Sequence, residues 1–138
     1  MRFNYDRIVH FKDTDAAGVV FFANILTICH EAYEHSLEMM GFELKLFFSN
    51  SGSYAVPIVQ AQVDFLHPIF CGDRLIINIQ PQKLDSYSFQ ISYKITNEHS
   101  KLLSIAQTKH ICISNTDRTK FILPIEIREW IAALNHSG

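Results

Sequence analysis

The sequence predicts one α+β domain in which an antiparallel β-sheet wraps around a single long helix. The chain has 138 residues, which is the usual length of one domain. Residues 24–40 carry apolar side chains at helical spacing in two rows, so this helix must be buried on most of its girth. The other regular segments alternate apolar and polar residues, as strands with one buried face do.

Residues 3–11 predict the first strand, because Phe3, Tyr5, Arg7 and Val9 share one face of an extended chain. We expect this strand to stop in a loop at residues 12–18, where small and acidic residues precede a glycine.

The long helix is predicted over Asn24 to Met40, with Asn24 as its N-cap and Gly41 in the left-handed conformation that often ends a helix. Its two apolar rows are Ile25, Ile28, Cys29, Ala32, Ser36 and Met39, and Leu26, Tyr33, Leu37 and Met40.

Four further strands and a short terminal helix follow. The strands are expected at residues 59–65, 75–79, 89–95 and 103–113, with Pro81 weakening the end of the second. In the first of these, Val59, Ala61, Val63 and Phe65 should form a buried face. Residues 124–134 form an amphipathic segment with proline at its first turn.

The composition narrows the function classes. Apolar residues make up 48% and charged residues 19%, which indicates a globular protein. A net charge of −2 argues against a nucleic-acid partner. Three widely spaced cysteines, Cys29, Cys71 and Cys112, favour free, buried thiols in a reducing compartment. With no signal-peptide pattern and no long apolar run, we expect a cytoplasmic protein without a membrane partner.

Two carboxylates in the loop before the long helix carry the predicted chemistry. Asp13 and Asp15 lie in a segment that runs directly into the helix. Unpaired amides at a helix N-terminus can stabilise the oxyanion that forms on a thioester carbonyl group. A nearby carboxylate can attack that carbon or deprotonate water. The combination predicts thioester hydrolysis.

The loop and the helix start also resemble a known family. The run from Phe11 to Asn24, Phe-Lys-Asp-Thr-Asp-Ala-Ala-Gly-Val-Val-Phe-Phe-Ala-Asn, with Glu31-Ala32 further along the helix, resembles the 4-hydroxybenzoyl-CoA thioesterase family of hotdog-fold enzymes. Within it the chain is most similar to the 1,4-dihydroxy-2-naphthoyl-CoA thioesterases of phylloquinone and menaquinone synthesis. The similarity extends to residues 65–68 and 71–75.

This resemblance implies that Asp15 is catalytic, as nucleophile or as general base, and that the Phe22 backbone N–H polarises the thioester carbonyl. Asp13 would be structural. Neither a cofactor nor a metal ion is implied, and the partner would be an acyl-CoA substrate. The family also implies a homodimer or homotetramer with active sites at the subunit interface. Four residues are candidates for substrate contact: Val19, Phe21, Tyr54 and Lys83.

The sequence also allows other interpretations. The chain could be a broader thioesterase for benzoyl or fatty-acyl groups, or a non-catalytic protein that binds acyl-CoA. His30 and His35 flank Glu31 as in a zinc-protease helix, but five residues separate them and place them about 140° apart around the helix. Glu31 remains an alternative catalytic carboxylate, because some hotdog thioesterases place theirs on the central helix.

Overall fold

The computed structural model describes residues 2–135, and its regular elements follow the predicted order. In chain order they are β1 (Phe3–Ile8), the 3-10 helix η1 (Phe11–Asp13), α1 (Phe22–Met39), α2 (Leu44–Phe47), β2 (Tyr54–Ala55), β3 (Ile58–Phe65), β4 (Arg74–Lys83), β5 (Ser88–Asn97), β6 (Leu102–Ile111), β7 (Ile113–Ser114) and α3 (Ile125–Asn135). The predicted α+β class and the single long helix are confirmed.

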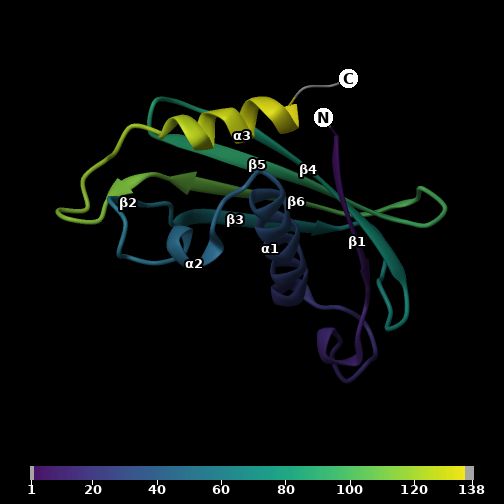
Figure 1. The fold of residues 1–138 in the computed structure, drawn as a ribbon. Coiled ribbons are helices and arrows are strands. Elements are labelled where there is room, and N and C mark those ends of the chain that lie inside the picture. Colours follow the sequence, from purple (N-terminus) through teal and green to yellow (C-terminus); the bar gives the residue numbers. More distant parts are fainter. Residues whose placement is uncertain (1, 136–138) are drawn as a thin grey trace.

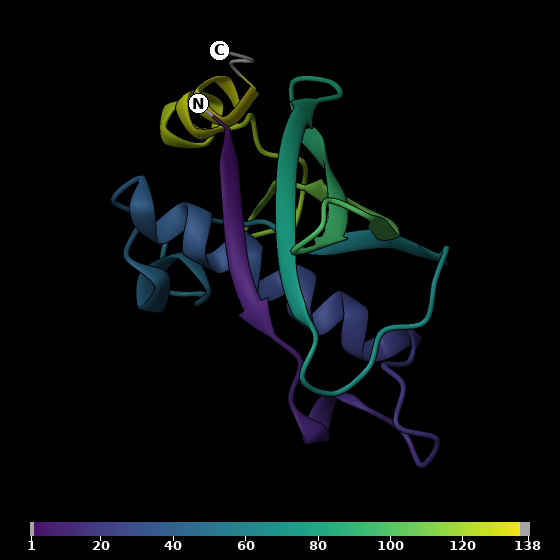
Figure 2. The same ribbon diagram turned by 90° about the vertical axis from the view of Figure 1, so that its right-hand side faces the viewer.

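Five strands form one antiparallel sheet in the order β1-β4-β5-β6-β3. The chain places β3 at one edge and β1 at the other, and β2 pairs with β7 in a small separate sheet. In Figure 1 the long strands curve behind α1, and α3 runs beside β4. The turned view in Figure 2 shows α1 crossing the sheet at a steep angle to β1 and β4.

The core lies between α1, α3 and one face of the sheet. Every second residue of β4, from Leu75 to Ile79, is fully buried, as the alternating pattern predicts. From α3, Trp130 donates a hydrogen bond from Nε1 to Ser36 Oγ of α1 at 3.0 Å, and its ring lies 5.7 Å from that of Tyr33. Both helices are therefore anchored to the same core.

The two ends of α1 differ from each other in how they are capped. Gly41 has φ +91°, and the amides of Gly41 and Phe42 donate to the carbonyls of Glu38 and Leu37, which completes the predicted left-handed stop. The predicted N-cap is wrong, because the helix begins at Phe22 after Phe21 and has no side-chain cap.

Three strand predictions need correction. β1 ends at Ile8 rather than at residue 11, because Phe11–Asp13 turns into η1. β4 continues through Pro81, which lies beyond the last residue of β4 paired with β1 and so interrupts no bond to that strand. The expected buried face of β3 is largely wrong: Val63 packs against the core, but Val59 is 51% exposed and Phe65 is 41% exposed on this edge strand.

Two expectations drawn from composition are also tested. Cys29 and Cys112 are buried free thiols as predicted, but Cys71 lies in an exposed turn, so the expectation that it is buried is wrong. Among residues 2–135, no helix combines the length and apolar character that crossing a membrane would require.

Candidate active site

The loop between β1 and α1 is a tight turn that Asp15 closes with its own side chain. The Asp15 amide donates to the Val19 carbonyl at 2.9 Å, and the Gly18 amide donates to the Asp15 carbonyl at 3.0 Å. Asp15 Oδ1 accepts the amides of Ala17 at 2.8 Å and Val19 at 3.4 Å. Gly18 adopts φ +82°, a conformation that favours glycine. The turn therefore orients the carboxylate through one oxygen.

The second carboxylate oxygen of Asp15 accepts no hydrogen bond from the described part of the chain. The residue is exposed to solvent. A free carboxylate oxygen on a rigid turn can act as a nucleophile or accept a proton from water.

The start of α1 supplies donors that no other group uses. Because Phe21 provides no side-chain cap, the amides of Phe22 and Ala23 have no acceptor within residues 2–135, whereas the Asn24 amide already bonds the Phe21 carbonyl. These two N–H groups carry the partial positive charge of the helix end. They form the type of donor pair that stabilises an oxyanion.

A buried arginine ties the same loop to α1. Arg7 Nε and Nη2 donate to the two carboxylate oxygens of Glu31 at 2.9 and 3.0 Å. Its Nη2 also donates to Asp13 Oδ1 at 3.2 Å, and its Nη1 donates to Asp13 Oδ2. Tyr5 Oη donates to Glu31 Oε1 at 3.1 Å. Asp13 is thus held by Arg7 within the loop, which is consistent with the structural role expected of it.

Asp13 and Arg7 have shifted pKa values. Burial acts to raise the pKa of Asp13, but hydrogen bonds from Arg7 and from the His10 amide outweigh it, so the pKa lies below its ordinary range. The same bonds, first to Asp13 and then to Glu31, raise the pKa of Arg7. Because Arg7 occupies both oxygens of Glu31, the geometry disfavours Glu31 as the attacking carboxylate.

Comparisons with known proteins show the family to which this chain belongs. Residues 9–133 match the family described as the thioesterase-like superfamily. The chain belongs to this superfamily. Proteins named 1,4-dihydroxy-2-naphthoyl-CoA hydrolase are similar over nearly their whole length. The one from Thermosynechococcus vestitus is 50% identical over 93% of this chain and 87% of its own. The one from Nostoc punctiforme is 52% identical over 95% and 87%.

A solved structure supports the same assignment to the thioesterase-like superfamily. A 1,4-dihydroxy-2-naphthoyl-CoA thioesterase from Synechocystis superimposes with a TM-score of 0.90 and 39% sequence identity, covering 99% of both chains. The predicted hotdog arrangement is therefore confirmed.

The four predicted substrate-contact residues of this superfamily member separate into two groups. Val19 and Phe21 lie at the helix start beside Asp15, where Val19 bridges to Phe70 and Phe21 is 45% exposed. Lys83 is exposed at the far end of β4, about 30 Å along the strand from Arg74, at roughly 3.3 Å per residue.

Tyr54 lies near the opposite end of α1. It stacks on Phe121, contacts Phe47, and donates a hydrogen bond to Glu126 at 2.8 Å. It lines a cavity of about 250 Å³ together with Phe42, which follows the C-terminal end of α1. One chain therefore does not bring Tyr54 or Lys83 to Asp15.

The contribution of Arg7 to this site was missed from the sequence, although a signal for it was present. Arg7 shares the inward face of the first strand with Phe3, Tyr5 and Val9, and a charge on a buried face requires a partner. What the sequence does not show is which partner, because Glu31 is 24 residues away. Within residues 2–135 we find no group of three or more His, Cys, Asp or Glu side chains placed to hold a metal ion.

Proposed function

We propose that this protein hydrolyses 1,4-dihydroxy-2-naphthoyl-CoA to 1,4-dihydroxy-2-naphthoate and coenzyme A. The observation that carries this proposal is the 50–52% identity to hydrolases of that name over more than nine tenths of the chain. The local geometry agrees with it, because a carboxylate with one free oxygen precedes a helix with two unpaired amides.

In the proposed mechanism the thioester carbonyl oxygen accepts the Phe22 N–H, which stabilises the negative charge of the tetrahedral intermediate. If Asp15 is the nucleophile, its free oxygen bonds to the carbonyl carbon, the C–S bond breaks and coenzyme A leaves as a thiolate. Water then hydrolyses the resulting anhydride and a proton neutralises the thiolate. If Asp15 is a general base, it takes a proton from the attacking water and this proton passes to the thiolate.

The active site should be completed by a second copy of the chain. Asp15 and Phe22 are exposed to solvent, and neither lines the cavity beside Tyr54. The edge strand β3 also presents Val59 and Phe65 to solvent. Burial of such an edge against a partner would remove its unpaired backbone groups from water. A homodimer, or a homotetramer built from two such dimers, would provide the missing wall and could bring Tyr54 or Lys83 of one subunit to Asp15 of the other.

The substrate places the reaction in phylloquinone or menaquinone biosynthesis. The cytoplasm is the proposed location, and the three free cysteines are in keeping with a reducing compartment.

A thiol-release assay with a matched pair of variants tests the proposal. Asp15→Asn should lower kcat by about 10² to 10⁴, the usual contribution of a positioned acid, base or nucleophile. Asp117→Asn is the control, because Asp117 is also an exposed aspartate whose Oδ1 accepts an amide two residues ahead. Its substitution should leave turnover unchanged.

The choice of substrates separates the alternatives. The wild-type protein should turn over the naphthoyl thioester faster than a benzoyl or straight-chain thioester. Faster turnover of a benzoyl or fatty-acyl thioester would favour the broader thioesterase. Binding of the naphthoyl thioester without turnover, unchanged in Asp15→Asn, would favour the non-catalytic acyl-CoA-binding protein.

A further inference from the structure

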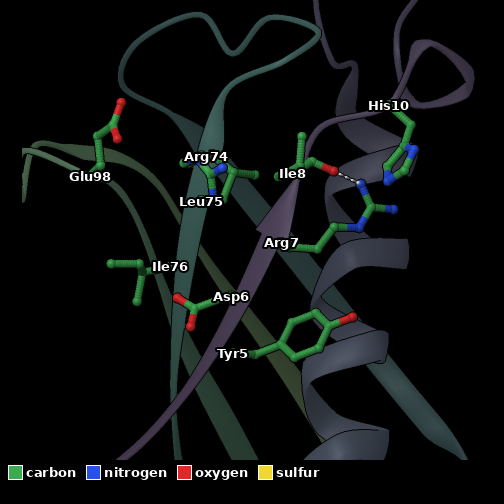
Figure 3. Close-up of a pocket in the computed structure, with 9 residues that line it drawn as sticks. All are labelled: Tyr5, Asp6, Arg7, Ile8, His10, Arg74, Leu75, Ile76 and Glu98. Carbon is green, nitrogen blue, oxygen red and sulfur yellow. Dashed lines mark hydrogen bonds between the residues drawn. The ribbon is translucent and has the colours of Figure 1, made fainter.

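The Arg7 side chain is almost completely buried between two carboxylates that come from different elements. Its side chain is 8% exposed, that of Asp13 is 6% exposed and that of Glu31 is 29% exposed. In Figure 3 Tyr5 and Arg7 extend from β1 toward α1, whereas Asp6 lies on the other side of the strand. Arg7 also donates to the carbonyl of Ile8 at 3.0 Å, so every nitrogen of its guanidinium group is used.

Asp13 is held at its side chain and at its backbone. Its Oδ2 accepts the His10 amide at 2.8 Å in addition to Arg7. Its carbonyl oxygen accepts the side-chain amide of Asn24 at 2.7 Å. Since Asn24 lies in the first turn of α1, the second bond ties the helix start directly to a peptide two residues before Asp15. Arg7 and Asn24 together form a clamp, and we use this name for the pair.

The clamp is better explained by geometry than by stability. Removing charged groups from water is costly. Well-packed apolar residues at the same positions often stabilise a fold as much as a buried ion pair does. Here one buried cation faces two carboxylates, so the charges are not balanced within the cluster. What the forked guanidinium does provide is a fixed distance and angle between the loop and α1, because its donors lie in one plane.

We propose that Arg7 and Asn24 are positioning residues that hold Asp15 at a fixed place relative to the Phe22 and Ala23 amides. This inference rests on the proposed thioester hydrolysis. The attacking oxygen and the oxyanion donors must reach the same carbonyl group, and misplacement by about 1 Å can cost about 10² in rate. In this proposal each clamp residue acts through the position of the loop, because their hydrogen bonds go to Asp13 and Glu31.

Arg7→Met and Asn24→Ala test the clamp in the full-length protein. Each variant should lower kcat for the naphthoyl thioester, Arg7→Met by about 10² and Asn24→Ala by about 10, while KM stays within about threefold. Arg7→Lys, which keeps the charge but loses the fork, should lie between Arg7→Met and the wild type. Arg74→Met is the matched control, because Arg74 is an exposed arginine that lines a groove together with Arg7 and Ile8, and the kcat of this variant should not change.

Urea unfolding of each variant separates positioning from folding. Asn24→Ala leaves no buried charge without a partner, so it should remain folded even if Arg7→Met does not. Wild-type kcat in folded Asn24→Ala and Arg7→Met would overturn the clamp alone. So would a loss of activity that matches the unfolded fraction, or a loss confined to KM. Absence of turnover by the wild type would instead overturn the proposed function, and the clamp with it.

Discussion

His110 should make the stability of this protein fall as the pH drops from about 6.5 to 5. Its side chain is fully buried in β6, stacked on Phe89 with ring centroids 4.7 Å apart. Its Nε2 lies 2.8 Å from Thr108 Oγ1, and its Nδ1 has no hydrogen-bond partner within residues 2–135. Burial, with a smaller effect from His30, lowers the pKa of His110 to about 3. The folded protein therefore holds this imidazole neutral.

The direction and size of the effect follow from proton linkage. The unfolded chain binds a proton at His110 below a pKa of about 6.5, whereas the folded chain does not until about pH 3. The contribution of neutral His110 to the free energy of unfolding is therefore fully present above about pH 6.5 and is lost as the pH falls toward 3. At pH 5, about 1.5 units below the unfolded pKa, the loss is about 2 kcal/mol, at about 1.36 kcal/mol per unit.

Urea unfolding at pH 7.5, 6.5, 5.5 and 5 measures this loss. These conditions stay above the range where Asp13, whose pKa is lowered, would begin to protonate. His110→Gln should lose about 2 kcal/mol less than the wild type between pH 7.5 and 5, because glutamine does not titrate. His99→Gln, at an exposed hairpin position, should keep the wild-type slope. An unchanged slope in His110→Gln would refute the assignment of a buried neutral imidazole.

Two further predictions concern the backbone and the thiols. Gly41→Ala should lower the free energy of unfolding by about 1 kcal/mol, because an alanine is strained at φ +91°, whereas Gly52→Ala, with open space at its Cβ and no positive φ, should change it little. Measurement is again by urea unfolding, and equal effects of the two variants would contradict the cap geometry. A thiol reagent should modify Cys71 quickly and Cys29 and Cys112 only after unfolding, because burial raises their pKa values to about 12 and about 11; three fast thiols per native chain would contradict this.

The interior strands and the long helix could be predicted because the apolar residues of each recur at the spacing of that type of element. Every second residue is buried from Leu75 to Pro81 in β4 and from Phe89 to Ile95 in β5, and α1 buries apolar residues at helical spacing. The sequence predicts the start of α1 two residues too late, because asparagine is a residue type that favours the N-cap position. The side-chain amide of Asn24 instead donates to the Asp13 carbonyl, a tertiary contact that local patterns do not reveal.

The candidate site was predictable to the extent that it is local. Asp15, the loop and the helix start are contiguous in the chain, so their order implies their proximity. Arg7 and Glu31 meet only because β1 lies beside α1, and the pairing depends on the register of both elements. Long-range partners of a buried charge follow from the fold rather than from spacing.

The wrong prediction of a buried face on β3 and the exposure of the candidate active site can be explained together. A strand that alternates apolar and polar residues encodes a buried face, yet Val59 and Phe65 are exposed in the single chain. Alternation reflects every surface that covers a strand, including one from a second copy, whereas the single chain contains only its own. Asp15 and Phe22 are exposed as well, so the proposed second copy would supply both the covering of this strand and a wall opposite the loop that holds Asp15. If a dimer forms as proposed, a charge placed at Val59 should therefore weaken association and thioester hydrolysis together, while a charge at the exposed Ile122, outside the β3 edge, should affect neither.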